Sequence, residues 1–188
     1  MNIKHKLDGV IILDDGREIR YTTWPETASG PVEKQNCYYD GTVKVKTATM
    51  FLNELKQQFN SFIHDDCEFE MKTNNQGIVS TAIGAKIDCR EIDVLRIDQL
   101  IDLMIADGAT EDTTADYILY DNTIKKVKLK DIRKAKIEMI RELMNMLYYK
   151  HELYGLVNAA IKESDLFITS TTGGMETRKP AIVWTWNK

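Results

Sequence analysis

Five consecutive residues at positions 64–68 are all of types that bind metal ions: His64, Asp65, Asp66, Cys67 and Glu68. A metal site needs ligands that converge on one point, as in a histidine pair four residues apart or a CxxC knuckle. Adjacent side chains on a helix end or a strand point apart, and the remaining histidines, His5 and His151, are far away in sequence. We therefore predict no metal site here and interpret the run as a polar connection between a helix and a strand.

Catalytic motifs are the next candidates, and the sequence has no GxSxG elbow, no GxGxxG loop and no GxxxxGKS loop. The segment TTGGME at 171–176 has two glycines but no lysine and no strand-to-helix context for binding phosphates. An enzyme needs a nucleophile, a base and an electrophile in identifiable roles. No such set can be named, so we predict that the protein is not an enzyme and uses no cofactor.

A dense basic segment is the strongest charge feature of the chain. Its cations are Lys125, Lys126, Lys128, Lys130, Arg133, Lys134 and Lys136. They resemble a phosphate-binding surface, but no aromatic residue lies between them to stack on bases. The preceding segment is strongly acidic, with Glu91, Asp93, Asp98, Asp102, Asp107, Glu111, Asp112, Asp116 and Asp121. Adjacent blocks of opposite charge favour pairing within the fold or between subunits over nucleic-acid binding.

Composition places the chain among ordinary globular proteins. It has 188 residues, 43% of them apolar and 29% charged, with a net charge of −4. This length fits one domain, or one domain with a small appendage. Three cysteines form no even-numbered disulfide framework, so we expect reduced thiols made in a cytosol. The apolar run at residues 9–13 is too short for a signal peptide or a membrane span.

Alternation and turn residues predict a β-rich N-terminal unit at residues 1–46, suited to attachment to a neighbouring protein. It contains a hairpin at 9–23 around Asp14-Asp15-Gly16 and a strand at 41–47. Helical spacing then predicts a helix at 49–63, with Thr47 or Thr49 as its N-cap. Alternation in CEFEMK, residues 67–72, predicts a strand.

The second half of the chain is predicted to be mostly helical. A helix at 93–106 ends near Gly108, and a hairpin at 116–129 turns at Asp121-Asn122-Thr123. Residues 131–162 predict either one long helix or two helices broken near His151. We expect a flexible loop at 169–174 and a last strand at 181–186. The predicted fold class is α+β. Candidate interface residues are Tyr148, Tyr149, Tyr154, Trp184 and Trp186.

The order of these pieces over residues 77–168 resembles an uncharacterised domain that recurs in bacteriophage tail and tail-fibre-associated proteins. The segments that carry the resemblance are GIVSTAIGAKIDCREIDVLRIDQLIDLM, YILYDNTIKKVKLKDI and MLYYKHELYGLVNAAIKESDL. The matching positions are Asp88, Asp93, Tyr120, Asp121, Asn122, Val127, Leu129, Leu147, Tyr148, Lys150, Ala159, Ala160 and Leu166. The family tends to have Ser or Thr as an N-cap before the long helix, whereas this chain has Lys128, which cannot accept that bond.

The resemblance implies no catalytic residues. Together with the predicted elements, it places an α+β tail-associated domain at 47–168, followed by a loop and strand at 169–188. It also implies a structural component of a phage tail, baseplate or tail fibre that acts by protein–protein assembly in the virion, after synthesis in the host cytoplasm. Expected partners are other tail proteins and further copies of the chain, with no membrane. The alternatives are a tail-fibre assembly chaperone that leaves the mature virion, or a small nucleic-acid-binding regulator.

Overall fold

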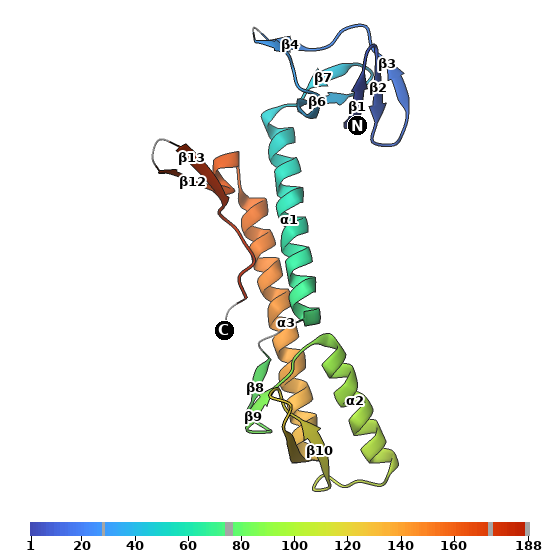
Figure 1. The fold of residues 1–188 in the computed structure, drawn as a ribbon, viewed down its shortest axis with the longest axis vertical. Coiled ribbons are helices and arrows are strands. Elements are labelled where there is room, and N and C mark those ends of the chain that lie inside the picture. Colours follow the sequence, from blue (N-terminus) through green and yellow to red (C-terminus); the bar gives the residue numbers. More distant parts are fainter. Residues whose placement is uncertain (28, 74–76, 173–174, 187–188) are drawn as a thin grey trace. The chain divides into compact units, whose positions relative to one another are not determined.

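The computed structural model describes residues 1–27, 29–73, 77–172 and 175–186, and it has an α+β fold (Figure 1). The strands of the described segments form antiparallel hairpins and one three-stranded antiparallel sheet. The chain divides into two compact units, Met1–Leu55 and Lys56–Lys188. The division lies inside helix α1 (Ala48–Thr73), so each unit contains one part of that helix. The predicted fold class is therefore confirmed.

Unit 1, Met1–Leu55, is built from short strands around a small core. The three-stranded sheet has the order β1 (Ile3–Leu7), β2 (Val10–Leu13) and β3 (Glu18–Arg20). The other pairs are β4 (Glu26–Thr27) with β5 (Gly30–Pro31), and β6 (Cys37–Tyr39) with β7 (Val43–Val45). A 3₁₀ turn covers Lys34–Asn36. The hairpin predicted at 9–23 is present, with Gly16 at φ 86° in its turn.

Helix α1 begins where predicted but continues ten residues beyond the predicted end at 63. Thr47 Oγ1 accepts a hydrogen bond from the Met50 amide at 3.3 Å, which confirms one of the two expected N-caps. The strand predicted at 67–72 is wrong, because Cys67 and Met71 bury the same helical face as Ile63. In a strand Phe69 would lie on the same face as Cys67 and Met71, but it is 66% exposed, as expected for a helix in which only every fourth residue faces the core. The run at 64–68 is consequently helical and not a connection.

Helix α2 (Glu91–Ala106) starts with a capping arrangement and ends as predicted. The Asp93 carboxylate accepts hydrogen bonds from the Arg90 amide at 3.2 Å and from Arg90 Nε at 2.6 Å. This satisfies a free amide at the helix start. At the other end, Gly108 adopts φ 77°, the left-handed conformation that stops a helix.

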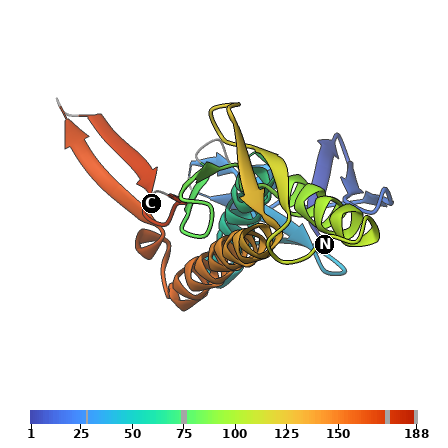
Figure 2. The ribbon, with the colours of Figure 1, turned by 90° about the horizontal axis from the view of Figure 1, so that it is seen from below.

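Two hairpins flank α2 in the sequence. The first pairs β8 (Ile78–Ser80) with β9 (Ala85–Ile87), and the second pairs β10 (Thr114–Ile118) with β11 (Ile124–Lys128). The second hairpin was predicted, and Asn122 adopts φ 64° in its turn. Figure 2 shows α2 beside the next helix, α3, with this hairpin on one side of the pair. Hydrogen bonds from Ser80 and Thr81 to Glu138 join the first hairpin to α3.

Helix α3 (Leu129–Ala159) is continuous, which decides between the two predicted alternatives. Lys128 precedes it and makes no side-chain cap. The backbone of the preceding loop takes that role, since the Leu129 amide donates to the Thr113 carbonyl at 2.9 Å and the Lys130 amide donates to the Glu111 carbonyl at 3.1 Å. Two amides of the first turn thus have partners without a Ser or Thr cap.

The C-terminal region differs from the prediction in two places. Residues 169–172 belong to strand β12 (Phe167–Thr172), which pairs with β13 (Met175–Pro180), so the predicted loop is wrong there. Gly173 and Gly174 lie outside the described residues. Residues 181–186 form no strand. A 3₁₀ turn, Glu163–Asp165, joins α3 to β12.

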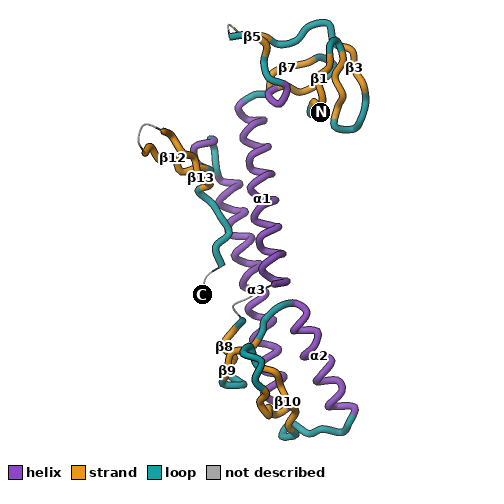
Figure 3. The backbone as a smooth tube through the Cα atoms, viewed as in Figure 1, coloured by secondary structure: helices purple, strands orange, loops and turns teal. Residues whose placement is uncertain are grey.

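Unit 2, Lys56–Lys188, has a core formed mainly by the helices. The second half of α1, residues 56–73, runs antiparallel to α3 (Figure 3), and Lys56 Nζ donates to the Asn158 carbonyl at 2.8 Å. One buried cluster joins α1, α2, α3 and both hairpins. It consists of Cys67, Met71, Ile83, Ile87, Cys89, Ile97, Ile101, Met104, Val127, Leu129, Ile132, Ala135, Met139, Leu143 and Met146.

Candidate functional site

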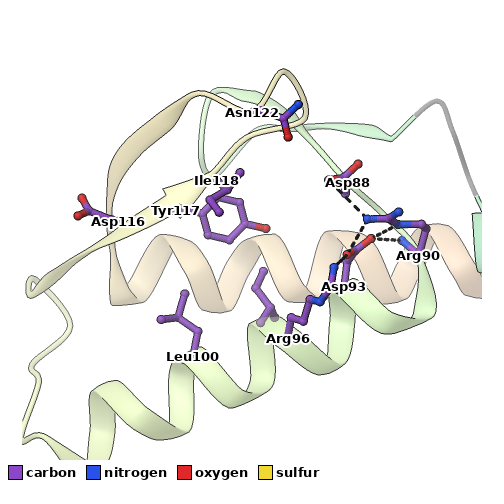
Figure 4. A pocket seen from close by; sticks show the side chains of 10 residues that line it. Asp88, Arg90, Asp93, Arg96, Leu100, Asp116, Tyr117, Ile118 and Asn122 are labelled. Carbon is purple, nitrogen blue, oxygen red and sulfur yellow. Dashed lines mark hydrogen bonds and ion pairs between the residues drawn. The ribbon is translucent and has the colours of Figure 1, made fainter.

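A cleft of about 420 Å³ lies between α2 and the β10–β11 hairpin (Figure 4). Apolar side chains from both elements form part of its wall, most of the charged groups gather at one end, and Asp116 lies at the other. The lining residues are Asp88, Arg90, Asp93, Arg96, Ile97, Leu100, Asp116, Tyr117, Ile118 and Asn122. Helix α2 supplies its polar first turn and its apolar middle, and the strand β10 supplies Tyr117.

Asp93 is the centre of the charged end. Only 8% of this residue is exposed, and its carboxylate also accepts from Arg90 Nη2 at 3.0 Å and from Arg96 Nη1 at 3.2 Å. The hydrogen bond to Asp93 raises the pKa of the Arg90 guanidinium. Asp88 lies 3.7 Å from Arg90 as a second anion. A buried carboxylate with two guanidinium partners is a satisfied network, and it holds the start of α2 in place.

Tyr117 fills the middle of the cleft, with its hydroxyl directed toward the Arg90–Asp93–Arg96 end (Figure 4). Burial raises the pKa of Tyr117 to about 12, and the negative charges of Asp93 and Asp88 act in the same direction. The phenol therefore stays protonated at neutral pH and is able to donate a hydrogen bond. A neutral phenol with paired arginines gives a polar contact surface and no activated nucleophile.

The basic segment predicted as a candidate surface is largely paired with acids of the same chain. Lys126 lies 2.7 Å from Asp116, and Lys128 and Lys130 lie 3.1 and 2.8 Å from Asp112. Two further ion pairs are Arg133 with Glu111 and Lys136 with Asp98. The two charge blocks therefore meet within the fold, which was one of the two predicted alternatives. Lysines that already pair with carboxylates bind phosphate groups more weakly than the same number of unpaired lysines would.

The two remaining cations of the basic segment, Lys125 and Lys134, have different environments. Lys125 Nζ donates to the Ile83 carbonyl at 2.6 Å and so links the two hairpins of unit 2. Lys134 is exposed on α3. Asp112, the shared partner of Lys128 and Lys130, has a lowered pKa because both ammonium groups donate to its carboxylate. The segment is therefore part of the framework that joins the hairpin to the start of α3.

The candidate aromatic interface residues divide into an internal group and an outward one. Tyr149, Trp184 and Trp186 form a cluster, with ring centroids 5.2 to 6.0 Å apart. Both tryptophans pack against the core of their own chain, so the expected interface strand at 181–186 is replaced by an internal contact on α3. Tyr154 is half-buried beside His151, whereas Tyr148 is 61% exposed.

A second, smaller hollow of about 210 Å³ lies between α1 and the chain after β13. Its lining is almost wholly apolar: Phe59, Phe62, Ile63, Asp66, Pro180, Ile182, Val183 and Trp184. Within the described segments, Trp184 Nε1 is buried and has no hydrogen-bond acceptor. Sequence reasoning missed this hollow because its two sides are more than a hundred residues apart.

The outer face of α3 is the second feature that sequence reasoning missed. Ile137, Ile140, Met144 and Tyr148 are each 39% to 61% exposed and recur every three or four residues. They lie on the side of α3 away from Ile132, Met139 and Met146, which are fully buried. The helix thus has two apolar faces. Apolar residues at helical spacing predict that a helix is buried, but they do not identify the surface that buries it. The spacing therefore does not separate the core face of α3 from its exposed apolar face.

The described part of the chain has no group of three or more His, Cys, Asp or Glu side chains that could hold a metal ion. None of its described helices is both long enough and apolar enough to cross a membrane. Burial raises the pKa of the Cys37, Cys67 and Cys89 thiols, to about 12 for Cys89, so these groups are poor nucleophiles. The chain matches no family model, no curated protein and no solved structure.

Proposed function

We propose that this chain is a structural component of a bacteriophage tail that acts by protein–protein assembly. The outer face of α3 carries the proposal. Four large apolar side chains, Ile137, Ile140, Met144 and Tyr148, lie in one row on a long helix and remain accessible to solvent. A contiguous exposed apolar row on a folded domain is typical of a surface that binds another protein.

Two further observations support an assembly role over the alternatives. The sequence of residues 77–168 resembles a domain of phage tail and tail-fibre-associated proteins. The basic segment, which would support a nucleic-acid-binding regulator, is mostly neutralised by Asp112, Asp116 and Glu111. A surface with its charges already paired gives little of the salt-dependent affinity that binds nucleic acid.

Quantitative mass spectrometry of purified virions of the phage that encodes the chain tests the proposal. We expect this polypeptide at a fixed copy ratio to the major capsid protein, and the ratio will indicate the symmetry of the tail part that contains it. Absence from virions, despite abundance in infected cells, would refute a structural role and favour the assembly chaperone.

A pair of variants connects this measurement to the α3 surface. Ile140→Lys places a charge in the exposed row, and Ile168→Lys makes the same change on β12 at a position that is 59% exposed. We expect virions to incorporate the Ile168→Lys chain normally and the Ile140→Lys chain poorly, because a lysine is unfavourable in an apolar contact. Equal incorporation of both variants would show that the α3 row does not attach the protein to the tail.

A further inference from the structure

Helix α2 has an exposed apolar row of its own. Ile92, Leu95 and Leu103 are 46% to 60% exposed. They lie away from Ile97 and Ile101, which pack into the core beside α3. Each outer face is therefore a separate exposed surface of the α2–α3 pair, whose helices lie beside each other in Figure 2.

The two outer faces have opposite charge. Helix α2 exposes Glu91 and Asp102, and its one cation, Arg96, donates to Asp93. Helix α3 exposes Lys134 and Arg141 along its apolar row. An acidic apolar face and a basic apolar face attract each other, whereas two copies of either face repel. Charge therefore favours contact between unlike faces over contact between like ones.

The apolar rows also match in length. Ile92 and Leu103 are eleven positions apart, and so are Ile137 and Tyr148. At a rise of 1.5 Å per residue, each row is roughly 16 Å long. Rows of equal length allow every apolar side chain of one helix to be covered by the other.

We propose that the outer face of α2 in one copy of this chain packs on the outer face of α3 in a second copy. This inference rests on the proposed function, since a tail component is present in many copies. The contact joins two different surfaces, so each added copy leaves one α2 face and one α3 face unused at the ends of the assembly. Such a heterologous contact grows into a closed ring or an open filament.

The contact is small, because three apolar side chains meet four. A single interface of this size is weak, and repetition around a ring stabilises it. We therefore expect self-association that depends strongly on protein concentration. Added salt will weaken it, because screening reduces the attraction between Glu91 or Asp102 and the facing cations.

Sedimentation velocity of the full chain and three lysine variants tests the proposal. Leu95→Lys alters the α2 face, Ile140→Lys alters the α3 face, and Ile168→Lys is the control on a surface with similar exposure. Helix content from circular dichroism checks that each variant is folded. We expect the wild type and the control to associate alike, and each of the other two variants to associate roughly tenfold more weakly.

A mixture of Leu95→Lys and Ile140→Lys gives the deciding result. The first variant keeps an intact α3 face and the second keeps an intact α2 face, so the mixture is expected to form one-to-one heterodimers that do not grow further. Three outcomes would overturn the proposal: a wild type that is monomeric at every concentration, association that neither variant weakens, or a mixture without heterodimers.

The virion measurement separates this proposal from the proposed function. A chain that is present in virions but monomeric in solution would refute the α2–α3 contact and leave the tail role standing. A chain that associates through this contact but is absent from virions would refute the tail role and leave the contact standing.

Discussion

The two compact units differ in what stabilises them. Unit 1 has a core of four buried residues, Ile3, Ile11, Leu13 and Cys37, and its strands are two to five residues long. In unit 2 the described residues include one cluster of 15 buried residues that joins three helices and two hairpins, beside further buried residues such as Leu153, Val157 and Leu166. Apolar burial contributes about 25 cal/mol per Å², so the larger cluster gives unit 2 most of the folding free energy.

The comparison shows how a small unit compensates for a small core. In unit 1 the partly buried rings of Tyr21 and Trp24 cover the core. The two rings pack edge to face, with their centroids 5.3 Å apart. Trp24 Nε1 donates to the Val32 carbonyl at 2.6 Å, and the Lys6 ammonium lies 4.3 Å from the Trp24 ring centroid. Such contacts hold a loop-rich unit together, but a unit of this size stays close to the limit of independent stability.

The largest expected effect is in the core of unit 2. Ile132→Ala removes a side chain with 0% exposure from the centre of the cluster, and we expect a loss of about 3 to 5 kcal/mol in the free energy of unfolding. Urea denaturation measures it. Ile105→Ala deletes the same atoms at a position on α2 that is 47% exposed, and it is expected to cost less than about 1 kcal/mol. Equal losses would show that the cluster is not the main source of stability.

The next effect is smaller in energy and confined to unit 1. Ile11→Ala is expected to cost about 2 kcal/mol, because a four-residue core can partly collapse around the deletion. Amide hydrogen exchange in residues 3–13 should become faster while α3 keeps its protection. Faster exchange in both regions would mean that the two units unfold together and would remove the distinction between them.

The buried thiols report on the same distinction through their reactivity. Cys37 in unit 1 and Cys89 in unit 2 are both fully buried, and burial raises the pKa of both, to about 12 for Cys89. The thiol pKa is 9.0 in an unfolded chain and higher in the folded state. The stability that this shift contributes is therefore present below pH 9 and is lost as the pH rises from 9 toward the folded-state pKa. At pH 8 both thiols should therefore react only after local opening.

We expect alkylation at pH 8, followed residue by residue with mass spectrometry, to modify Cys37 several-fold faster than Cys89, since unit 1 opens more easily. Cys67 of α1, which is buried in the same cluster as Cys89, should behave like Cys89. Identical rates for all three cysteines would indicate one cooperative opening of the whole chain.

The sequence predicted elements whose signals are local. The hairpin turns at Asp14-Asp15-Gly16 and Asp121-Asn122-Thr123, and the end of α2 at Gly108, depend on residues that tolerate positive φ, and all are present. The strand predicted at 67–72 failed because Cys67, Phe69 and Met71 alternate with polar residues as a strand does. In the structure Cys67 and Met71 continue the buried face of α1 from Ile63, whereas Phe69 is 66% exposed.

Features that depend on distant partners could not be predicted. Nothing near Trp184 and Trp186 in the sequence indicates that they pack against Tyr149 of α3, so they were expected on an outer strand. The start of α3 at Leu129 depends on carbonyls of Glu111 and Thr113, and these replace the side-chain cap that the sequence lacks. The cleft at Asp93 and the two apolar faces of α3 likewise arise from tertiary packing.

The smallest expected effect concerns exposed ion pairs, which both units have. Asp15 pairs with Arg17 at 2.8 Å in unit 1, and Asp112 pairs with Lys130 at 2.8 Å in unit 2. The pKa of each carboxyl is lowered, by the Arg17 amide for Asp15 and by the two lysines for Asp112. A lowered carboxyl pKa contributes stability above about pH 3.8, the unperturbed value, and loses it as the pH falls through the folded-state pKa.

We expect Asp15→Asn and Asp112→Asn to leave the thermal midpoint at pH 7 almost unchanged, because water and salt screen exposed pairs. Any small difference from the wild type should shrink between pH 7 and pH 3, because protonation of the unfolded-state carboxylates below about pH 3.8 begins to remove the stability that the ionised pair contributes. Thermal melts at the two pH values measure this. If Asp112→Asn destabilised the chain at pH 7 as much as Ile11→Ala, exposed ion pairs would contribute as much as core size to the difference in stability between the two units. A null result in both variants leaves the size of the buried core as the physical difference between them.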